Sequence, residues 1–319
     1  MKVMVTGGSG IVGHYVISEL VTHDYQVVNA DRTRPGDLGH STTSSVASRE
    51  TAARMRDDWG VDVGFVQLDV TDYGQVVSAM EGCDAVVHLA AAPTNVGFIE
   101  EIVFATNTAS MWNIMRAAEQ LGVSKVVLGS SYNAIGALGT AARWGGKMKP
   151  AEYFPVDEDH PTRAEEAYSV SKWVGEQVAD AFGRRNPDMQ LASMRFNGMW
   201  DDERLRELNA NPVMDVSERA ASFWTYLHLG DAARACRMSI EAEWRGHHRF
   251  FLNARDIMLG MPTADAIAKV YPTVPMRRQL GEFEAPIETA RAGRLFGWEP
   301  LFSWRDERFA PRGRPPATV

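Results

Sequence analysis

The sequence predicts an α/β protein built on a doubly wound parallel sheet, followed by a small C-terminal subdomain. Short apolar runs alternate with helical patterns from residue 2 to residue 197, which is typical of parallel strands connected by helices. The first run leads into a glycine-rich turn and a helix, so the chain begins with a βαβ unit. After Arg195 the regular alternation lapses, and this change marks the start of a different kind of structure.

The first part is expected to contain six strands. The apolar runs that predict them are KVMVT at 2–6, YQVVNADR at 25–32, GFVQLDV at 64–70, DAVVHLA at 84–90, KVVLGSS at 125–131 and QLASMRF at 190–196. Helical patterns separate these runs at 14–23, 49–58, 73–81, 101–121 and 165–184, and the Ser- and Thr-rich stretch from Thr33 to about Ser48 predicts a loop.

The second part carries weaker patterns. Residues 198–222 have clustered charges, an Asn-Pro pair and no clear strand, so we expect a loop that faces the ligand. A helix at 230–242, a strand at 249–254 and a helix at 263–271 follow. The last ten residues, 310–319, are expected to form a disordered tail.

Composition excludes several classes of function. The chain has 319 residues, of which 45% are hydrophobic, so it can bury a large core. A net charge of -8 and a pI near 5.5 argue against a basic face for nucleic acid or for an anionic membrane. The apolar start at Met1–Val5 is too short for a signal peptide or a membrane span. Cys83 and Cys236 show no disulfide or metal-ligand spacing, so we expect no metal site and a cytoplasmic location.

The turn TGGSGIVG lies between a strand and a helix, and a glycine-rich turn in that position is typical of nucleotide binding. Gly7 permits the tight bend, Gly10 lets the backbone approach a pyrophosphate at the helix N-terminus, and Gly13 lets the helix pack close to the sheet. We expect Ile11 and Val12, which follow Gly10, to contact the same ligand. The alternative is a plain strand-turn-helix bend without a ligand.

Asp31 ends the second strand about 20 residues after the glycines. Its carboxylate can accept hydrogen bonds from an adenosine ribose and would repel a 2′-phosphate. Arg32 and Arg34 could offset that repulsion, and their alternative role is ordinary solvated charge. We therefore expect NAD, with NADP less favoured, and we assign Arg32 to the cofactor site.

Two further strand ends point to the same edge of the sheet. Asp69 ends the third strand, and its carboxylate could reach the adenine, although an Asp at a strand end equally often forms a turn. Small residues after His88 would let a cofactor pass close to the backbone, whereas His88 itself is expected to be structural. The predicted contacts here are Asp69, Val70, Leu89, Ala90 and Ala91.

These signals together define a Rossmann-type dinucleotide-binding domain of residues 1–197 with about 223–245. The smaller substrate-binding region then comprises about 198–222 and 246–309.

The segment YSVSK places the phenol of Tyr168 and the ammonium of Lys172 four residues apart on one helix face. A tyrosine that acts as a base near neutrality needs a pKa about three units below its usual 10, or roughly 4 kcal/mol. A cation about 4 Å away supplies roughly that amount at an effective dielectric near 20. The alternative is a surface Tyr and Lys on an amphipathic helix.

The ordered set of motifs resembles an extended short-chain dehydrogenase/reductase of the NAD-dependent epimerase/dehydratase type. The resemblance covers nearly the whole chain. It rests on TGGSGIVG, Asp31, Asp69-Val70, HLAA, Asn107 in NTAS, Ser130-Ser131 and YSVSK, and later on MRFN at 194–197, TYLHLGDAARA at 225–235 and RAGRLFGWEP at 291–300.

The resemblance implies a catalytic set of Ser131, Tyr168 and Lys172. Tyr168 would exchange a proton with the substrate oxygen, while Lys172 would bind the nicotinamide ribose and lower the pKa of the tyrosine. Ser131 would hydrogen-bond the reacting oxygen, with Ser130 as the second choice and a strand-end cap as the structural alternative. Asn107 is assigned to the cofactor site, although Ser110 stands where the family usually has glycine. A homodimer through the helices at 101–121 and 165–184 is also implied.

The reaction class is narrowed by two departures from relatives of the same type. Tyr132-Asn133 follow Ser131 where dehydratases have Asp-Glu, so dehydration is disfavoured. The segment from Arg195 to His228 is short and acidic early, a poor lining for a diphosphate. We expect an NAD(P)-dependent oxidoreductase acting on a hydroxyl or carbonyl of a small carbohydrate-like substrate. The alternatives are a nucleotide-sugar epimerase with tightly bound NAD and a redox-sensing binding protein.

Other side chains are weaker candidates. The motif with His228 and Asp231 could touch substrate, but it more often anchors a loop to the following helix. Three tryptophans could form a wall for a sugar or could pack in the core: Trp144, Trp200 and Trp224. Three cations could dock an anionic group or remain solvated: Arg143, Lys147 and Lys149.

Overall fold

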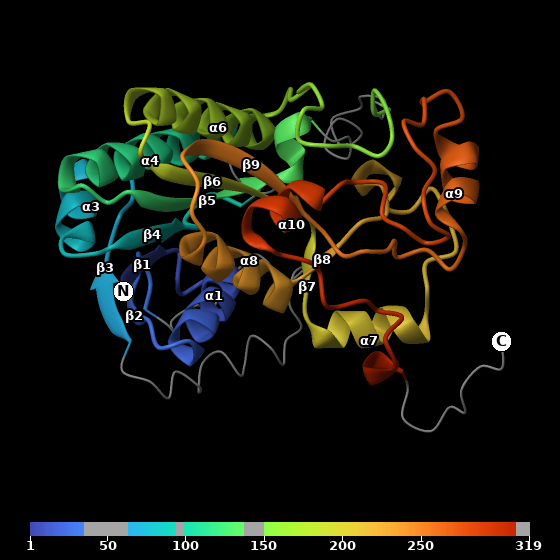
Figure 1. The fold of residues 1–319 in the computed structure, drawn as a ribbon, viewed down its shortest axis with the longest axis horizontal. Helices are drawn as coiled ribbons and strands as arrows, with labels where there is room; N and C mark the ends of the chain where they lie inside the picture. Colours follow the sequence, from blue (N-terminus) through green and yellow to red (C-terminus); the bar gives the residue numbers. More distant parts are fainter. Residues whose placement is uncertain (35–62, 94–98, 137–149, 311–319) are drawn as a thin grey trace.

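A seven-stranded parallel sheet forms the centre of the protein, seen here in a computed structural model that describes residues 1–34, 63–93, 99–136 and 150–310 (Figure 1). The strands lie in the order β3-β2-β1-β4-β5-β6-β9, and every neighbouring pair is parallel. Their bounds are β1 Lys2–Thr6, β2 Gln26–Asp31, β3 Gly64–Gln67, β4 Ala85–His88, β5 Lys125–Ser131, β6 Gln190–Phe196 and β9 Gly246–Leu252. The predicted fold class, an α/β doubly wound sheet, is confirmed.

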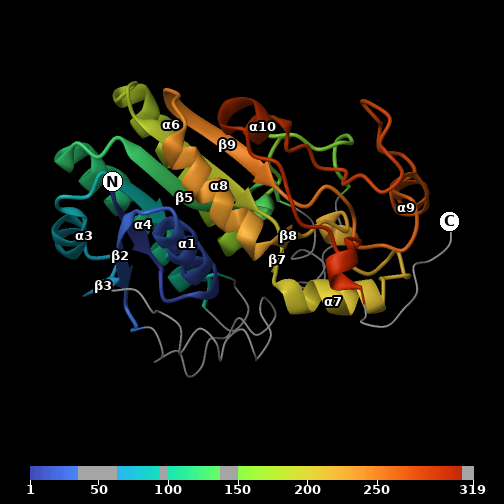
Figure 2. The same cartoon turned by 60° about the horizontal axis from the view of Figure 1, so that its bottom comes forward.

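Helices cover both faces of the sheet, as Figures 1 and 2 show. One face carries α1 Ile11–Thr22 and α8 Leu229–Glu241, and the other carries α3 Tyr73–Met80, α4 Glu100–Leu121 and α6 Ala167–Arg185. Alternation along β1 explains the two layers, because Val3 and Val5 pack in the core under α1 and α8 while Met4 packs in the core under α4 and α6. Both faces of the central strands are therefore apolar.

The smaller part lies beyond the carboxyl ends of β5, β6 and β9 (Figures 1 and 2). It contains β7 Met199–Trp200, α7 Asp202–Ala210, β8 Leu227–His228 and α9 Thr263–Val270, with the short helices η1 Tyr132–Ile135, η2 Ala220–Ser222 and η3 Glu307–Phe309 nearby. Its own core is rich in aromatic rings, including Phe154, Phe223, Trp224, Tyr271 and Trp304. The helix α10 Ala290–Phe296, which the sequence patterns did not predict, packs back against the α8 side of the sheet.

The expectation that 198–222 is a loop was wrong. The segment contains β7, α7 and η2, and α7 is a well-formed helix. The side chain of Asp201 caps it by accepting a hydrogen bond of 3.0 Å from the backbone N–H of Arg204. Leu205 and Leu208 are buried on its inner face, so a helix with mostly charged residues still has an apolar stripe to pack.

The boundary between the two parts also differs from the sequence-based division. That division placed residues from 246 onward in the smaller region, whereas β9 pairs with β6 from Gln190↔Gly246 to Phe196↔Leu252 and thus completes the main sheet. The assignment of the parts to cofactor and substrate stays a prediction. The predicted loop and helix between Thr33 and residue 58, and the predicted tail at 310–319, fall almost entirely outside the described residues. Within the described residues, no helix is long and apolar enough to cross a membrane.

Candidate active site

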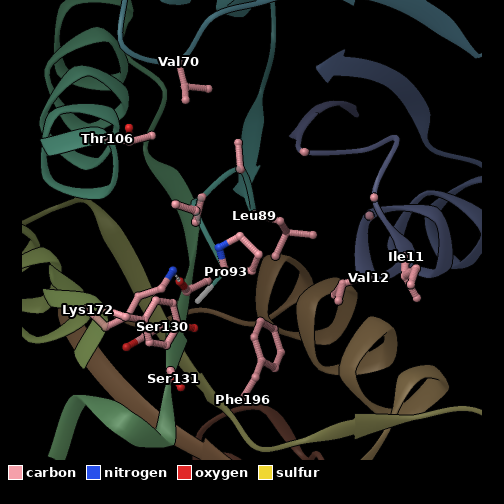
Figure 3. Close-up of a pocket in the computed structure, with 18 of the residues that line it drawn as sticks. Ile11, Val12, Val70, Leu89, Pro93, Thr106, Ser130, Ser131, Lys172 and Phe196 are labelled. Atoms are coloured by element: carbon pink, nitrogen blue, oxygen red, sulfur yellow. Dashed lines mark hydrogen bonds between the residues drawn. The ribbon is translucent and has the colours of Figure 1, made fainter. Parts of the chain in front are cut away.

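A cavity of about 870 Å³ runs across the carboxyl edge of the sheet, from the glycine turn to the N-terminal end of α6 (Figure 3). Figure 3 shows Ile11 and Val12 on one side and Ser130, Ser131 and Lys172 on the other. All but one of the predicted site residues line this cavity: Gly7, Gly10, Ile11, Val12, Gly13, Asp31, Arg32, Asp69, Val70, Leu89, Ala90, Ala91, Ser131, Tyr168 and Lys172. Their individual roles stay predictions, but the structure places them together.

The glycine turn fits a dinucleotide because side chains are sterically excluded there. Gly7 has a φ of 69°, and a Cβ on it would lie 2.7 Å from the backbone nitrogen of Ala90. A Cβ on Gly13 would overlap the carbonyl oxygen of Gly7. Gly10, the N-cap of α1, provides no side-chain acceptor for the first N–H groups of the helix. These N–H groups suit a pyrophosphate at the cavity wall.

Asp31 is fixed at the tip of β2 by two backbone donors. Its Oδ2 accepts a hydrogen bond of 3.1 Å from the N–H of Ser9, and its Oδ1 accepts one of 3.1 Å from the N–H of Thr33. A carboxylate held in this way keeps free lone pairs on the cavity side for ribose hydroxyls. Arg32 lines the cavity beside it, whereas Arg34 stacks over the ring of Phe65, 5.3 Å from the centroid.

Asp69 also lines the cavity, but its contacts are those of a turn former. Its Oδ1 accepts hydrogen bonds from the N–H of Thr71 at 2.9 Å and from the hydroxyl of Thr71 at 2.7 Å. These bonds hold the pKa of Asp69 below its usual value, with a smaller contribution from Arg32. The turn-forming alternative is therefore the one that the contacts support.

His88 is a structural residue, as expected. It is buried at the end of β4, and its Nδ1 lies 2.7 Å from the hydroxyl of Thr6 on the paired strand. Burial, and then the nearby charge of Lys172, lower the pKa of His88 to about 3. The ring is neutral near pH 7 and lies beneath the cavity wall that Leu89, Ala90 and Ala91 form.

The catalytic candidates lie where β5 meets the start of α6. Glu166 caps α6, because its side chain accepts hydrogen bonds of 2.8 Å from the N–H of Tyr168 and 2.7 Å from the N–H of Ser169. Ser131 ends β5, and its hydroxyl oxygen accepts a hydrogen bond of 3.1 Å from the N–H of Asn133. The cap thus places the phenol in the first turn of the helix, beside the serine.

Lys172 does not activate Tyr168 in the way that the sequence reasoning expected. Its Nζ donates a hydrogen bond of 2.6 Å to the carbonyl oxygen of Gly129 and lies 5.6 Å from the centroid of the Tyr168 ring. Burial raises the pKa of Tyr168 to about 12, and the Ser131 hydroxyl opposes that shift. Burial also lowers the pKa of Lys172 to about 8, against the charge of Glu176. The protein alone therefore keeps the phenol protonated near neutrality.

Asn107, the one predicted cofactor contact that is not on the cavity wall, lies behind it. Its side chain accepts a hydrogen bond of 2.8 Å from the N–H of Ala92 and donates ones of 3.2 Å to the Ala92 carbonyl and 2.9 Å to the hydroxyl of Ser171. It ties α4 to α6 and to the segment after β4. Ser110, in place of the usual glycine, is buried and bonds back to the carbonyl of Asn107 at 3.1 Å. Asn107 thus supports the site without lining it.

The weaker candidates are structural where the structure describes them. His228 caps α8 by accepting a hydrogen bond of 3.1 Å from the N–H of Gly230, and the buried carboxylate of Asp231 accepts bonds from the N–H groups of Leu301 and Phe302. Two tryptophans are buried in the core of the smaller part instead of forming a sugar wall: Trp200 and Trp224. Trp144, Arg143, Lys147 and Lys149 lie outside the described residues.

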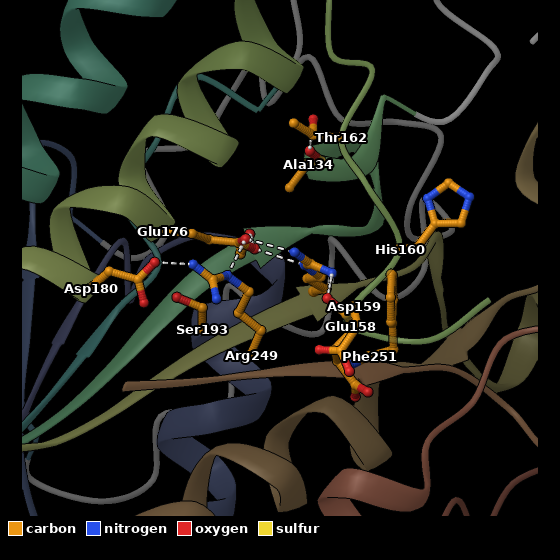
Figure 4. A network of polar contacts seen from close by, with 12 residues as sticks. Ala134, Glu158, Asp159, His160, Thr162, Glu176, Asp180, Ser193, Arg249 and Phe251 are labelled. Carbon is orange, nitrogen blue, oxygen red and sulfur yellow. Dashed lines mark hydrogen bonds and ion pairs between the residues drawn. The ribbon is translucent and has the colours of Figure 1, made fainter. Parts of the chain in front are cut away.

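Sequence reasoning missed part of the cavity wall and a buried ion-pair network beneath it (Figure 4). The wall also includes Pro93, Thr106, Tyr132, Asn133, Phe196, Asn197, Gly198 and Met199. The network centres on Glu176, four residues after Lys172 on the same helix. That spacing was the available signal, since residues four apart share a helix face.

Comparisons with known proteins agree with this geometry. The model of the NAD dependent epimerase/dehydratase family matches residues 3–199. An L-arabinose 1-dehydrogenase (NAD(P)(+)) from Haloferax volcanii is 28% identical over 211 residues, which are 65% of this chain and 80% of that protein. A UDP-glucose 4-epimerase from Bacillus subtilis is 26% identical over 201 residues, 61% of this chain and 52% of that protein. This chain thus matches about half the length of that epimerase.

Solved structures show the same fold. The crystal structure of a UDP-glucose-4-epimerase from Stenotrophomonas maltophila with bound NAD has a TM-score of 0.67 at 20% identity, covering 95% of this chain and 94% of that one. A mutated uronate dehydrogenase has a TM-score of 0.61 at 19% identity, covering 95% of this chain and 82% of that one. At these identities the similarity establishes the fold.

Proposed function

Since the chain belongs to the NAD-dependent epimerase/dehydratase family, we propose that it is an NAD-dependent oxidoreductase acting on a small carbohydrate-like substrate. The observation that carries the proposal is the single cavity that joins the glycine turn and Asp31 to Ser131, Tyr168 and Lys172. A dinucleotide site alone would suit a sensor as well. The acid/base candidate at its far end favours an enzyme.

Each of the three residues at the α6 end of the cavity has its own role in the proposed reaction. When bound, NAD supplies the nicotinamide carbon that accepts a hydride from the substrate carbon. In reduction the Tyr168 phenol donates its proton to the substrate oxygen, and in oxidation its phenolate form takes the proton of the substrate hydroxyl. The Ser131 hydroxyl, whose oxygen accepts from Asn133 and which hydrogen-bonds Tyr168, would donate its proton to the substrate oxygen once a substrate is bound. The Lys172 ammonium, directed to Gly129, has further N–H donors for ribose hydroxyls.

The smaller part favours a compact substrate. From the segment 198–222, only Gly198 and Met199 line the cavity, whereas α7 packs Leu205 and Leu208 into the neighbouring core. This arrangement supports net oxidation or reduction of a free sugar or sugar derivative over nucleotide-sugar epimerisation.

The direct test is turnover. Purified protein with NAD⁺ and a panel of aldoses, uronates and sugar alcohols is expected to produce NADH absorbance with at least one of them. Tyr168→Phe serves as the matched control, since it should bind NAD⁺ without producing NADH. Interconversion of a UDP-sugar without net NADH would replace the proposal by the epimerase. NAD⁺ binding with no turnover of any compound in either assay would favour a dinucleotide sensor.

We also propose a homodimer in the cytoplasm. Three large apolar side chains on α4 and α6 are exposed and do not line the cavity: Phe104, Trp112 and Trp173. A second copy packed against these helices would cover them. Light scattering of the purified protein tests the dimer, and cell fractionation tests the location.

A further inference from the structure

Glu176 is a buried carboxylate with four hydrogen bonds. Its side chain is 1% exposed, on the face of α6 that lies against the sheet. Its Oε1 accepts bonds of 2.7 Å from the hydroxyl of Ser130 and 2.9 Å from Nε of Arg195. Its Oε2 accepts bonds of 2.8 Å from Nη2 of Arg195 and 2.9 Å from Nε of Arg249. A single carboxylate therefore joins α6 to β5, β6 and β9 (Figure 4).

The register of the sheet explains why these groups meet. Ser130 pairs with Arg195 across β5 and β6, so both side chains point to the same face. Ser193 on β6 pairs with Arg249 on β9. His247, two residues before Arg249 on β9, has its Nδ1 2.8 Å from Oδ1 of Asp180, which lies one turn after Glu176 on α6. Asp180 also forms an ion pair with Arg249. The arginines are thus balanced by two acids from one helix.

The network lies directly behind the catalytic candidates. Ser130, which donates to Glu176, is the neighbour of Ser131, and the carbonyl of Gly129 accepts from Lys172. Strand β5 is therefore held to α6 at two consecutive residues, one by a lysine and one by an acid. A shift of β5 along α6 would break both bonds and would move Ser131 away from Tyr168.

Glu176 also bears on the charge of Lys172. The ionisable groups that bear on the ammonium are Glu176 and Tyr168 on its own helix and His88 from β4. His88 is neutral and Tyr168 is protonated near pH 7, because burial shifts the pKa of each in that direction. Glu176 is thus the anion that opposes the effect of burial on the Lys172 pKa.

We propose that Glu176 is a positioning residue for the reaction: it aligns the serine end of β5 with α6 and stabilises Lys172 as an ammonium. This role rests on the proposed function. Glu176 does not line the cavity, so it acts through Ser130 and Lys172 and not on the substrate.

The charge part is tested without substrate. Lysine side-chain NMR of the purified protein, with the Lys172 signal assigned by its loss in Lys172→Met, gives the pKa of Lys172. Wild type should titrate near the pKa of about 8 that the structure indicates. Glu176→Gln should titrate about one unit lower. Asp180→Asn is the matched control. Asp180 is a second acid on α6 that pairs with Arg249, but its contacts are with β9 and not with β5. A Lys172 pKa that Glu176→Gln leaves unchanged, or that Asp180→Asn lowers equally, overturns the charge role.

The alignment part is tested with Ser130→Ala, which keeps every ion pair of Glu176 and removes its bond to β5, together with one hydroxyl of the cavity wall. We expect kcat to fall about tenfold while the Kd for NAD⁺ and the melting temperature stay near wild type. A kcat within about twofold of wild type would reject the alignment role. This variant carries the test even if Glu176→Gln does not fold. Normal NAD⁺ binding with no activity in wild type would fault the proposed function instead, and the NMR result would still stand.

Discussion

The ammonium of Lys172 donates a hydrogen bond of 2.6 Å to the carbonyl oxygen of Gly129, and so it is directed at β5 and not at the phenol of Tyr168. The pKa of Tyr168 is accordingly raised to about 12 by burial, with no lowering by the lysine. A tyrosine in this state is a ready acid and a poor base. For oxidation, it needs a further positive charge at the open side of the cavity, which an oxidised nicotinamide carries.

Tyr168→Phe is predicted to reduce kcat by at least a hundredfold, because it removes the hydroxyl group that exchanges a proton with the substrate oxygen. The Kd for NAD⁺ should change by less than about threefold, since the ring remains in place. Steady-state kinetics and a fluorescence titration with NAD⁺ check the two parts. Activity within a few-fold of wild type would remove Tyr168 as the acid/base.

Asp31→Ser is predicted to weaken NAD⁺ binding by about tenfold or more, because a charged acceptor at the tip of β2 is lost. It should also bring NADP⁺ closer to NAD⁺ in affinity, since the repulsion of a 2′-phosphate disappears while Arg32 remains. Titrations with both dinucleotides measure the ratio. Asp69→Asn is the comparison variant, because that carboxylate is already engaged by Thr71 and should alter the ratio little. An unchanged ratio in Asp31→Ser would contradict the ribose role.

The nucleotide half of the site could be predicted because its signals are local. The bend at Gly7, the helix that starts after Gly10 and the strand that ends at Asp31 all lie within one βαβ unit. The family resemblance then supplied Ser131, Tyr168 and Lys172, which the cavity brings together.

The Glu176 network could not be predicted in this way. It depends on the register of β5, β6 and β9. That register places Ser130 beside Arg195, although the two residues are 65 positions apart in the sequence. Helix α7 was missed for a different reason, because clustered charges hid the cap at Asp201 and the stripe of Leu205 and Leu208. The bond from Lys172 to the carbonyl oxygen of Gly129 could not be predicted either, since the spacing of residues on a helix does not show which group a lysine side chain reaches.

His88→Gln is predicted to make the protein less sensitive to acid. The pKa of His88 is about 3 when folded and about 6.5 when unfolded, so the unfolded state binds the extra proton below about pH 6.5. The free energy of unfolding therefore falls as pH falls, by about 2 kcal/mol from this residue at about pH 5. Glutamine cannot titrate and can still bond the Thr6 hydroxyl.

Urea denaturation at about pH 7.5 and about pH 5 measures this effect. The wild type should lose about 2 kcal/mol more than His88→Gln between the two conditions. If both proteins lose the same amount, the histidine is not held neutral in the folded state.

Asp231→Asn is predicted to lower stability without changing the chemistry. The carboxylate is fully buried and accepts hydrogen bonds of 3.0 to 3.1 Å from the N–H groups of Leu301 and Phe302, together with one of 2.8 Å from Arg234. An amide would direct an N–H group at those donors and would leave the arginine without its charge partner. The expected cost is about 2–4 kcal/mol, or a melting temperature lower by about 5–10 °C.

Below the melting transition, kcat and KM of this variant should match wild type, because Asp231 does not line the cavity. Asp202→Asn is the control, since Asp202 is a 52% exposed partner of His228 and should cost far less stability. The alternative from the sequence was that Asp231 touches substrate. That alternative predicts the opposite pattern, a raised KM with an unchanged melting temperature, so calorimetry and kinetics on one variant distinguish an anchor from a binding residue.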